Sequence, residues 1–337
     1  MKREVKKGSR RLVYRDRHRG LRNCNEEARP VARRCLLLSL LLAIGLSSCR
    51  KDSPVGSPTR PRLKAVVSVL PQAYFVQRVG GEGVEADVLV GPGQDPHTFE
   101  PTPQQMARLS EAAVYFRIGM PFETRLLEKI ASINRNLKIV DTAEGVELMD
   151  MSEGEAGHHH HAEPAAAGHP SGDKDPHIWL DPKLVKMQAE TIRRALVELD
   201  PPGADTYRAN LACFQDDLDR LDQRLAKTLA PLRGREFFVY HPAFGYFAAA
   251  YGLKQVAVET GGKEPGPRQV AELVERAKQQ GVKVVFVQPQ FSDKAARAIA
   301  RQIGGVVVPM DDLPRDYIAS MDRMAGSIEQ ALGKTAP

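Results

Sequence analysis

Short apolar runs rich in Val alternate with helix-forming segments along residues 63–141 and again along residues 234–332. Strands that alternate with helices are typical of a parallel sheet with helices packed on it, so each stretch predicts one α/β lobe. The expected strands lie at 63–70, 84–90, 112–118, 137–140, 236–240, 254–258, 282–288 and 305–309. The expected helices beside them lie at 71–79, 103–110, 122–133, 242–251, 267–280, 292–302 and 316–332.

One long amphipathic helix is predicted between the two stretches. From Tyr207 to Leu229 apolar residues recur every three or four positions, which makes one continuous apolar stripe. A helix over about residues 204–230 would be roughly 40 Å long, which is long for a single lobe. The sequence therefore predicts an α/β fold in which two lobes, 63–203 and 231–337, are joined by a rigid helix.

The alternation breaks at residues 152–176, where SEGEAGHHHHAEPAAAGHPSGDKDP has no apolar periodicity. This segment is expected to be a mobile loop of the first lobe. A His-rich tract in such a segment is typical of metal binding, and a passive solvated spacer is the alternative. The candidate auxiliary ligands in the loop are His158, His159, His160, His161 and His169.

A secretory signal is predicted at the N-terminus. Arg33 and Arg34 precede an apolar run at 36–46, and small residues follow it. A basic region, a short apolar core and small exit residues are the parts of a signal peptide. The run is shorter than the roughly 20 residues that span a bilayer, although a short retained anchor is the alternative.

The exit from this run, LSSC at 46–49, resembles the lipobox of bacterial lipoproteins. Residues 1–48 would then be a lipoprotein-type signal peptide, and Cys49 would carry the lipid. Residues 49–62 are polar and rich in Pro and Ser, as expected of a flexible tether. Cleavage would leave Cys213 as the remaining cysteine, so we expect no internal disulfide and a packed Cys213 side chain.

Positive charge is confined to the predicted leader. Residues 1–35 carry thirteen Lys/Arg and four Asp/Glu, a net charge of +9. Residues 49–337 carry thirty-five Lys/Arg and thirty-eight Asp/Glu, a net charge of −3. The body therefore lacks the excess of positive charge that nucleic-acid binding needs, and no nucleic-acid partner is expected.

Three histidines outside the loop have distinctive settings. His97 and His241 each follow a predicted strand, one in each lobe, and His177 lies at the entrance of a helix. Asp311 also follows a predicted strand. Ligands of open α/β sheets bind beyond the carboxyl ends of strands, and three imidazoles with one carboxylate suit tetrahedral Zn²⁺. The alternative for each His is an ordinary surface or core residue.

The segments around these residues resemble the metal-specific solute-binding proteins of ABC transporters, which take up zinc or manganese. The resemblance rests on GPGQDPHTFEPTP, DPHIWLDP, HPAFGYFAAAYG and VVVPMDDLPRDYIASM. It implies two α/β lobes with a metal in the cleft between them, bound by His97, His177, His241 and Asp311. Asp312 is adjacent and the family's usual Pro after the Asp is absent, so Asp311, Asp312 or water could complete the site.

The resemblance also implies a membrane permease and an ATPase as partners. His at the third ligand position and a His-rich loop are marks of the zinc members of this family, while manganese members tend to have Glu there. Imidazole suits zinc better than manganese, so Zn²⁺ is the expected cargo, with Mn²⁺ or Fe²⁺ as alternatives. We expect an exported monomer, lipid-anchored to a bacterial membrane and facing the periplasm or cell exterior.

Two other functions compete with metal uptake. A zinc hydrolase would need an open coordination position and a general base, and the sequence has no HExxH motif. A metal-dependent adhesin is the second alternative, because members of this family sometimes receive that label. The expectation is a binding protein and not an enzyme.

Overall fold

The computed structural model describes residues 61–151, 174–259 and 261–333 of the 337-residue chain. Three expected features lie outside these residues and stay predictions: the signal peptide, the lipidated Cys49 with most of its tether, and the His-rich tract. That tract holds His158, His159, His160, His161 and His169.

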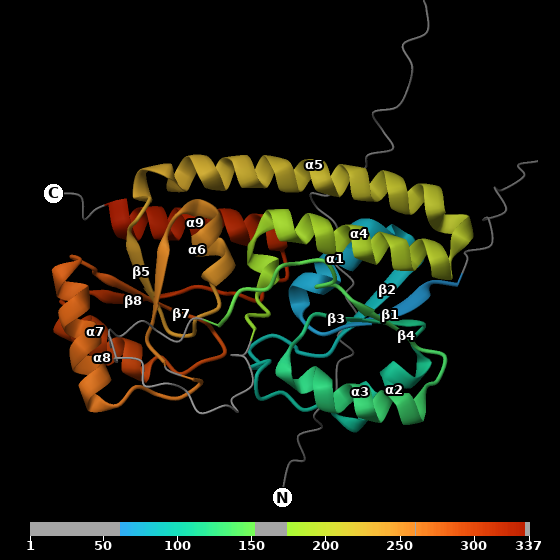
Figure 1. Ribbon diagram of the computed structural model, residues 1–337, viewed down its shortest axis with the longest axis horizontal. Coiled ribbons are helices and arrows are strands. Elements are labelled where there is room, and N and C mark those ends of the chain that lie inside the picture. The colour runs from blue at the N-terminus through green and yellow to red at the C-terminus, as the bar shows by residue number, and fades with distance from the viewer. Residues whose placement is uncertain (1–60, 152–173, 260, 334–337) are drawn as a thin grey trace, which may run out of the picture.

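Two four-stranded parallel sheets form the centres of two lobes (Figure 1). The strand order is β2-β1-β3-β4 in the first lobe and β6-β5-β7-β8 in the second, so the second lobe repeats the topology of the first. The prediction of a two-lobe α/β fold with parallel sheets is confirmed. The strands are β1 (Leu63–Val67), β2 (Val84–Val88), β3 (Val114–Arg117), β4 (Lys138–Asp141), β5 (Glu236–Val239), β6 (Lys254–Ala257), β7 (Val284–Val287) and β8 (Val306–Pro309).

The register places the carboxyl ends of the central strands level with one another. Val67, the last residue of β1, pairs with Val88 of β2 and with Phe116 of β3. In the second lobe Val239, the last residue of β5, pairs with Ala257 of β6. Loops that follow neighbouring strands therefore leave the sheet at one edge, where side chains from several loops can meet.

Helices connect successive strands and cover the sheets. In the first lobe they are α1 (Leu70–Gly80), α2 (Pro103–Glu111) and α3 (Pro121–Ile133), and in the second they are α6 (Gly245–Tyr251), α7 (Pro267–Gln279) and α8 (Lys294–Gln302). Thr102 caps α2 by accepting a hydrogen bond from the Gln105 backbone N–H, and Pro103 occupies the first turn.

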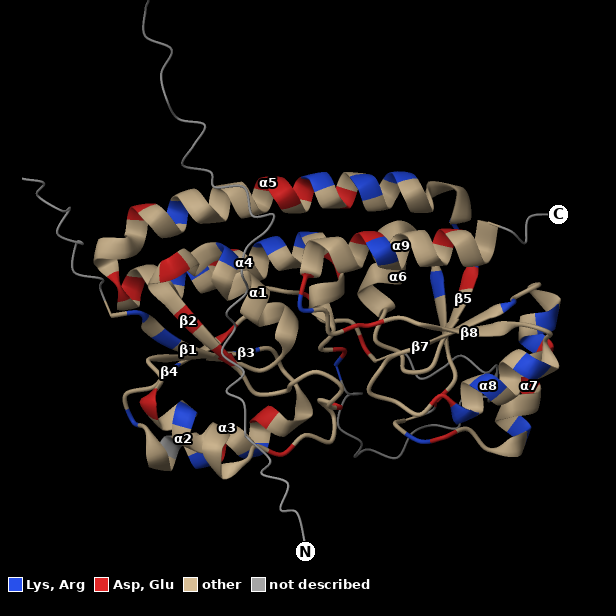
Figure 2. Cartoon of the chain, turned by 180° about the vertical axis from the view of Figure 1, so that it is seen from behind, with Lys and Arg blue, Asp and Glu red and all other residues tan. Residues whose placement is uncertain are grey.

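Three further helices form a layer behind both lobes: α4 (Pro182–Leu199), α5 (Ala204–Leu229) and α9 (Tyr317–Gly333). Figure 1 shows α5 running along most of the length of the molecule, with α4 and α9 beneath it. Its apolar stripe is buried, and Figure 2 shows charged residues along α5. The stripe consists of Tyr207, Leu211, Phe214, Leu218, Leu221, Leu225 and Leu229.

Some expected boundaries shift. Helix α1 begins at Leu70, which was expected to end a strand, because Pro71 has the fixed φ that suits a first helical turn. The helix expected from residue 242 begins only at Gly245. The expectation that the cleaved chain has no internal disulfide stays a prediction, because Cys24, Cys35 and Cys49 lie outside the described residues.

Within the described residues, the structure contains no helix that combines the length and apolar character needed to cross a membrane.

The α5 stripe predicts where the fold is most sensitive to truncation. Leu221→Ala removes a side chain with no exposed surface and should lower the free energy of unfolding by about 2–5 kcal/mol. Gln223→Ala, on the exposed face of the same helix, is the control and should change it by less than about 0.5 kcal/mol. Urea titration of the two variants measures the difference, and equal effects would contradict the buried stripe.

Candidate metal site

A cleft of about 910 Å³ lies between the two lobes. The first lobe contributes Asp95, His97 and Gly119 to its walls, and the second lobe contributes His241, Glu259 and Phe291. Met151 and Lys174 also line it.

Three of the predicted ligands lie together here: His97 and His241 line the cleft, and the buried His177 lies beside them. Each of His97, His177 and His241 offers one ring nitrogen, and these three nitrogens lie within 4.8 Å of one another. The Nε2 atoms of His177 and His241 are 3.3 Å apart, and the ring of His97 lies 4.7 Å from that of His241, centroid to centroid. Among the described residues this is the group of side chains that could hold a metal ion.

His241 occupies the point where the strand order of the second sheet reverses. It follows β5 by two residues, and Gln288 follows β7, the neighbouring strand on the other side of the reversal. The Gln288 amide accepts a hydrogen bond from the His241 N–H and donates one to the His241 carbonyl. Open α/β sheets bind ligands at such a reversal, so β5 and β7 together position this imidazole.

Buried carboxylates orient two of the three imidazoles. His177 Nδ1 lies 2.7 Å from Asp175 Oδ1, and His241 Nδ1 lies 2.6 Å from Glu259 Oε1. A carboxylate can only accept, so each Nδ1 carries the ring hydrogen and each Nε2 presents a lone pair. Two lone pairs facing each other at 3.3 Å are favourable only when a cation lies between them.

His97 reaches the cleft from the long loop after β2. Its Nε2 atom is buried and has no hydrogen-bond partner among the described residues. Burial, helped by the neighbouring His177 and His241, lowers the pKa of His97 to about 2. This imidazole is therefore neutral at ordinary pH, which is the state that binds metal.

The expected fourth ligand, Asp311, does not join this group. Asp311 is exposed as a residue, although partial burial of its carboxyl group raises its pKa, and it accepts a hydrogen bond from the Leu313 N–H, 2.9 Å away. Asp312 is 1% exposed and accepts a hydrogen bond from the Gln290 amide. Burial raises the pKa of Asp312 to about 6, against the opposing effects of His241 and Gln290. Of the two neighbouring aspartates, Asp312 is thus the buried one whose carboxylate interacts electrostatically with His241.

The wall of the cleft in the first lobe depends on Glu123. This buried carboxylate accepts hydrogen bonds from the Ser68 hydroxyl and from the N–H groups of Ile118 and Gly119. Gly119 lines the cleft with φ at +96°, a conformation that costs glycine little. Burial raises the pKa of Glu123, and its hydrogen bonds act in the opposite direction.

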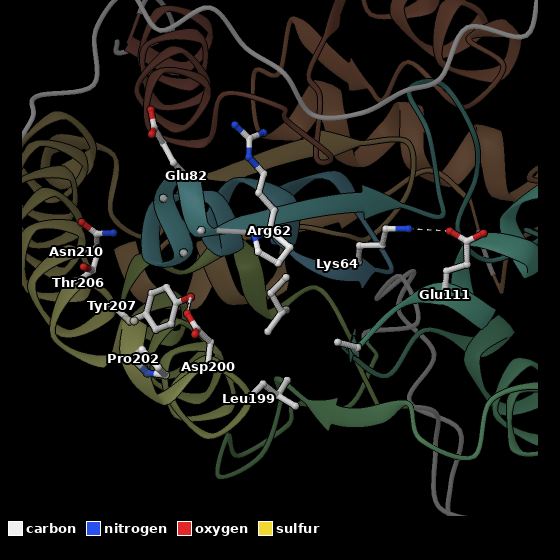
Figure 3. A pocket seen from close by; sticks show the side chains of 17 residues that line it. Arg62, Lys64, Glu82, Glu111, Leu199, Asp200, Pro202, Thr206, Tyr207 and Asn210 are labelled. Carbon is white, nitrogen blue, oxygen red and sulfur yellow. Dashed lines mark hydrogen bonds and ion pairs between the residues drawn. The ribbon is translucent and has the colours of Figure 1, made fainter. Parts of the chain in front are cut away.

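A second hollow, of about 860 Å³, lies at the opposite edge of the first sheet, where the strands begin. Figure 3 shows Lys64 directed at Glu111, with which it forms an ion pair of 2.7 Å. The Tyr207 hydroxyl donates to Asp200 in the same hollow. The candidate metal group lies in the inter-lobe cleft and not here.

Residues 65–331 match the model of a protein family described as zinc-uptake complex component A periplasmic. The chain belongs to this family. The zinc-binding lipoprotein AdcA of Streptococcus pneumoniae serotype 4 is 27% identical to it over 315 residues, which are 90% of this chain and 61% of AdcA. The chain thus spans less than two thirds of that relative's length.

Two further relatives match over most of their length. The high-affinity zinc uptake system protein ZnuA of Bacillus subtilis (strain 168) is 28% identical over 289 residues, covering 84% of this chain and 89% of ZnuA. A crystal structure of a ZnuA superposes with a TM-score of 0.73 and 41% identity, over 81% of this chain and 100% of the other.

Sequence reasoning missed the residues that orient the imidazoles. Asp175 stands two residues before His177 inside the DPHIWLDP motif, and Glu259 follows β6 as His241 follows β5. The rule that carboxyl ends of parallel strands share one edge could have indicated Glu259. Which imidazole each carboxylate contacts depends on the packing of the loops.

The low pKa of His97 predicts a loss of stability in acid for the metal-free protein. In the unfolded chain His97 takes up a proton near pH 6.5, whereas in the native chain it does so only near pH 2. This contribution to stability is therefore present above pH 6.5 and is lost as the pH falls below it, by at most about 1.4 kcal/mol per pH unit from this residue. Denaturant titrations between pH 7 and 4.5 should show a shallower loss in His97→Gln, and an identical slope would contradict this.

Proposed function

We propose that this chain is the zinc-binding component of an ABC metal importer and that His97, His177 and His241 bind the ion it carries. The observation that supports this most directly is the pair of Nε2 atoms 3.3 Å apart, with a third, unpartnered Nε2 on His97. Three imidazoles from separate loops of two lobes would enclose one ion and release it when the lobes separate.

Zinc is the cargo that this set of atoms favours. Imidazole nitrogens suit zinc, whereas manganese prefers carboxylate and water oxygens. Asp175 and Glu259 place negative charge behind two of the imidazoles, which makes the ring nitrogens better donors to a cation. Manganese or iron is the alternative cargo of the same importer class.

The family is the substrate-binding part of metal-uptake systems, so the chain is a binding protein and not an enzyme. This role requires a membrane permease and an ATPase as partners, and export from the cytoplasm. A lipid anchor at Cys49 and a monomeric state complete the proposal. Both rest on the sequence, since Cys49 lies outside the described residues.

A competition titration tests the proposed cargo and its site. The body of the chain, residues 62–337, would be stripped with a chelator and titrated with Zn²⁺, Mn²⁺ and Fe²⁺ against a calibrated chelator. We expect one tight zinc site per chain. His241→Ala should weaken zinc binding more than about 100-fold, because losing a ligand costs more affinity than losing a residue that only supports a ligand. Tight manganese binding with weak zinc binding would identify manganese as the cargo in place of zinc. The absence of any tight site would overturn the proposed function.

The fourth coordination position can be examined with a matched pair of variants. Asp312→Asn should weaken zinc binding about tenfold because it removes a buried charge beside His241. Asp311→Asn should change it less than about threefold, because Asp311 is exposed. The reverse ranking would favour Asp311 as the ligand, and small effects of both would favour water.

The His-rich tract is proposed to bind metal more weakly than the cleft and to collect it. Deleting residues 157–170 should leave one tight zinc site per chain and remove the weaker ones. Isothermal titration with zinc measures both classes of site. Loss of the tight site on deletion would contradict this division.

A further inference from the structure

His177 is attached to the second lobe by the residues on either side of it. Asp175 and Trp179 both lie before α4, on the part of the chain that leads out of the first lobe. The Tyr246 hydroxyl, on α6 of the second lobe, donates to the Asp175 carbonyl at 2.9 Å. The Trp179 indole N–H donates to the Asp312 carbonyl, also in the second lobe, at 2.6 Å.

Water has little access to either hydrogen bond. Tyr246 is 4% exposed, and Trp179 is fully buried. The same Tyr246 hydroxyl accepts a hydrogen bond from the Met149 N–H, and the Asp175 N–H donates to the Met149 carbonyl. Tyr246 thus joins two loop segments of the first lobe, at Met149 and at Asp175. The second segment orients His177 through the Asp175 carboxylate.

The segment that carries His97 is held differently. Within the described chain, the hydrogen bonds of residues 91–102 stay inside the segment or the first lobe. His97 itself is fixed through its backbone N–H, which donates to Asp95. Its ring contacts that of His241 in the second lobe, with the centroids 4.7 Å apart.

We propose that Tyr246 and Trp179 are positioning residues which make His177 part of the second lobe, so that His177 and His241 form a two-imidazole half-site and His97 closes it. Movement of the first lobe would then change the distance from His97 to the other two rings. The distance between His177 and His241 would stay the same, and the ion would remain on this pair after His97 has withdrawn. This inference rests on the proposed role of the three His as ligands.

Tyr246→Phe tests the proposal, and Tyr251→Phe is its matched control. Both tyrosines lie on α6, both are 4% exposed, and each hydroxyl makes a hydrogen bond to another element, that of Tyr251 to Asp222. In the full chain, zinc release into excess chelator should be about tenfold faster in Tyr246→Phe and changed less than twofold in Tyr251→Phe. Equal release rates in the two variants would overturn the proposal.

Cobalt binding in a His97→Ala background tests the half-site itself through its visible absorption. One Co²⁺ per chain should still bind, and adding Tyr246→Phe or Trp179→Phe should abolish the band, while adding Tyr251→Phe should not. If Tyr246→Phe lowers the melting temperature of the metal-free protein, Trp179→Phe replaces it as the test variant. If His97→Ala loses cobalt as completely as His177→Ala, the half-site is overturned. If the unsubstituted chain has no tight zinc site, the proposed function itself fails.

Discussion

The site depends on two hydrogen bonds between buried carboxylates and imidazoles, Asp175 to His177 and Glu259 to His241. Without them each ring could rotate or exchange its hydrogen between nitrogens, and the two Nε2 lone pairs would not face one point. The arrangement is unfavourable in the absence of a cation, because two nitrogen lone pairs meet at 3.3 Å. The fold thus holds these rings in a geometry that a bound cation would relieve.

Packing on the layer of α4, α5 and α9, which is common to both lobes (Figure 1), offsets the cost of this unfavourable geometry. The core that packs against it runs through the first lobe into α6 and α9, so much of the hydrophobic stabilisation is shared between the lobes. A separate core lies between the second sheet and helices α7 and α8.

The two lobes use equivalent positions of one topology for different purposes. In the second sheet, the reversal between β5 and β7 carries a candidate ligand, His241, supported by Gln288. In the first sheet, the reversal between β1 and β3 carries Ser68 and the buried Glu123, which shape the wall of the cleft. The first lobe contributes its candidate ligand from the long loop after β2 instead. One lobe therefore holds its candidate ligand rigidly, and the other carries a candidate ligand on a loop held mainly by its own hydrogen bonds.

Local pattern in the sequence determined much of this protein. Val-rich runs between helical segments predicted both sheets, and the stripe from Tyr207 to Leu229 predicted the long helix almost to its ends, since side-chain periodicity follows directly from helix and strand geometry. The sequence also indicated His97 and His241, because each follows a predicted strand, while His177 was indicated by its place at the entrance of a helix and by the family resemblance. Only the tertiary structure decided what lies beside them. Asp175 and Glu259 orient two of the rings, and of the two neighbouring aspartates Asp312 is the buried one. Local pattern does not give these contacts, because contacts between loops distant in sequence depend on how the two sheets pack on a shared layer of helices.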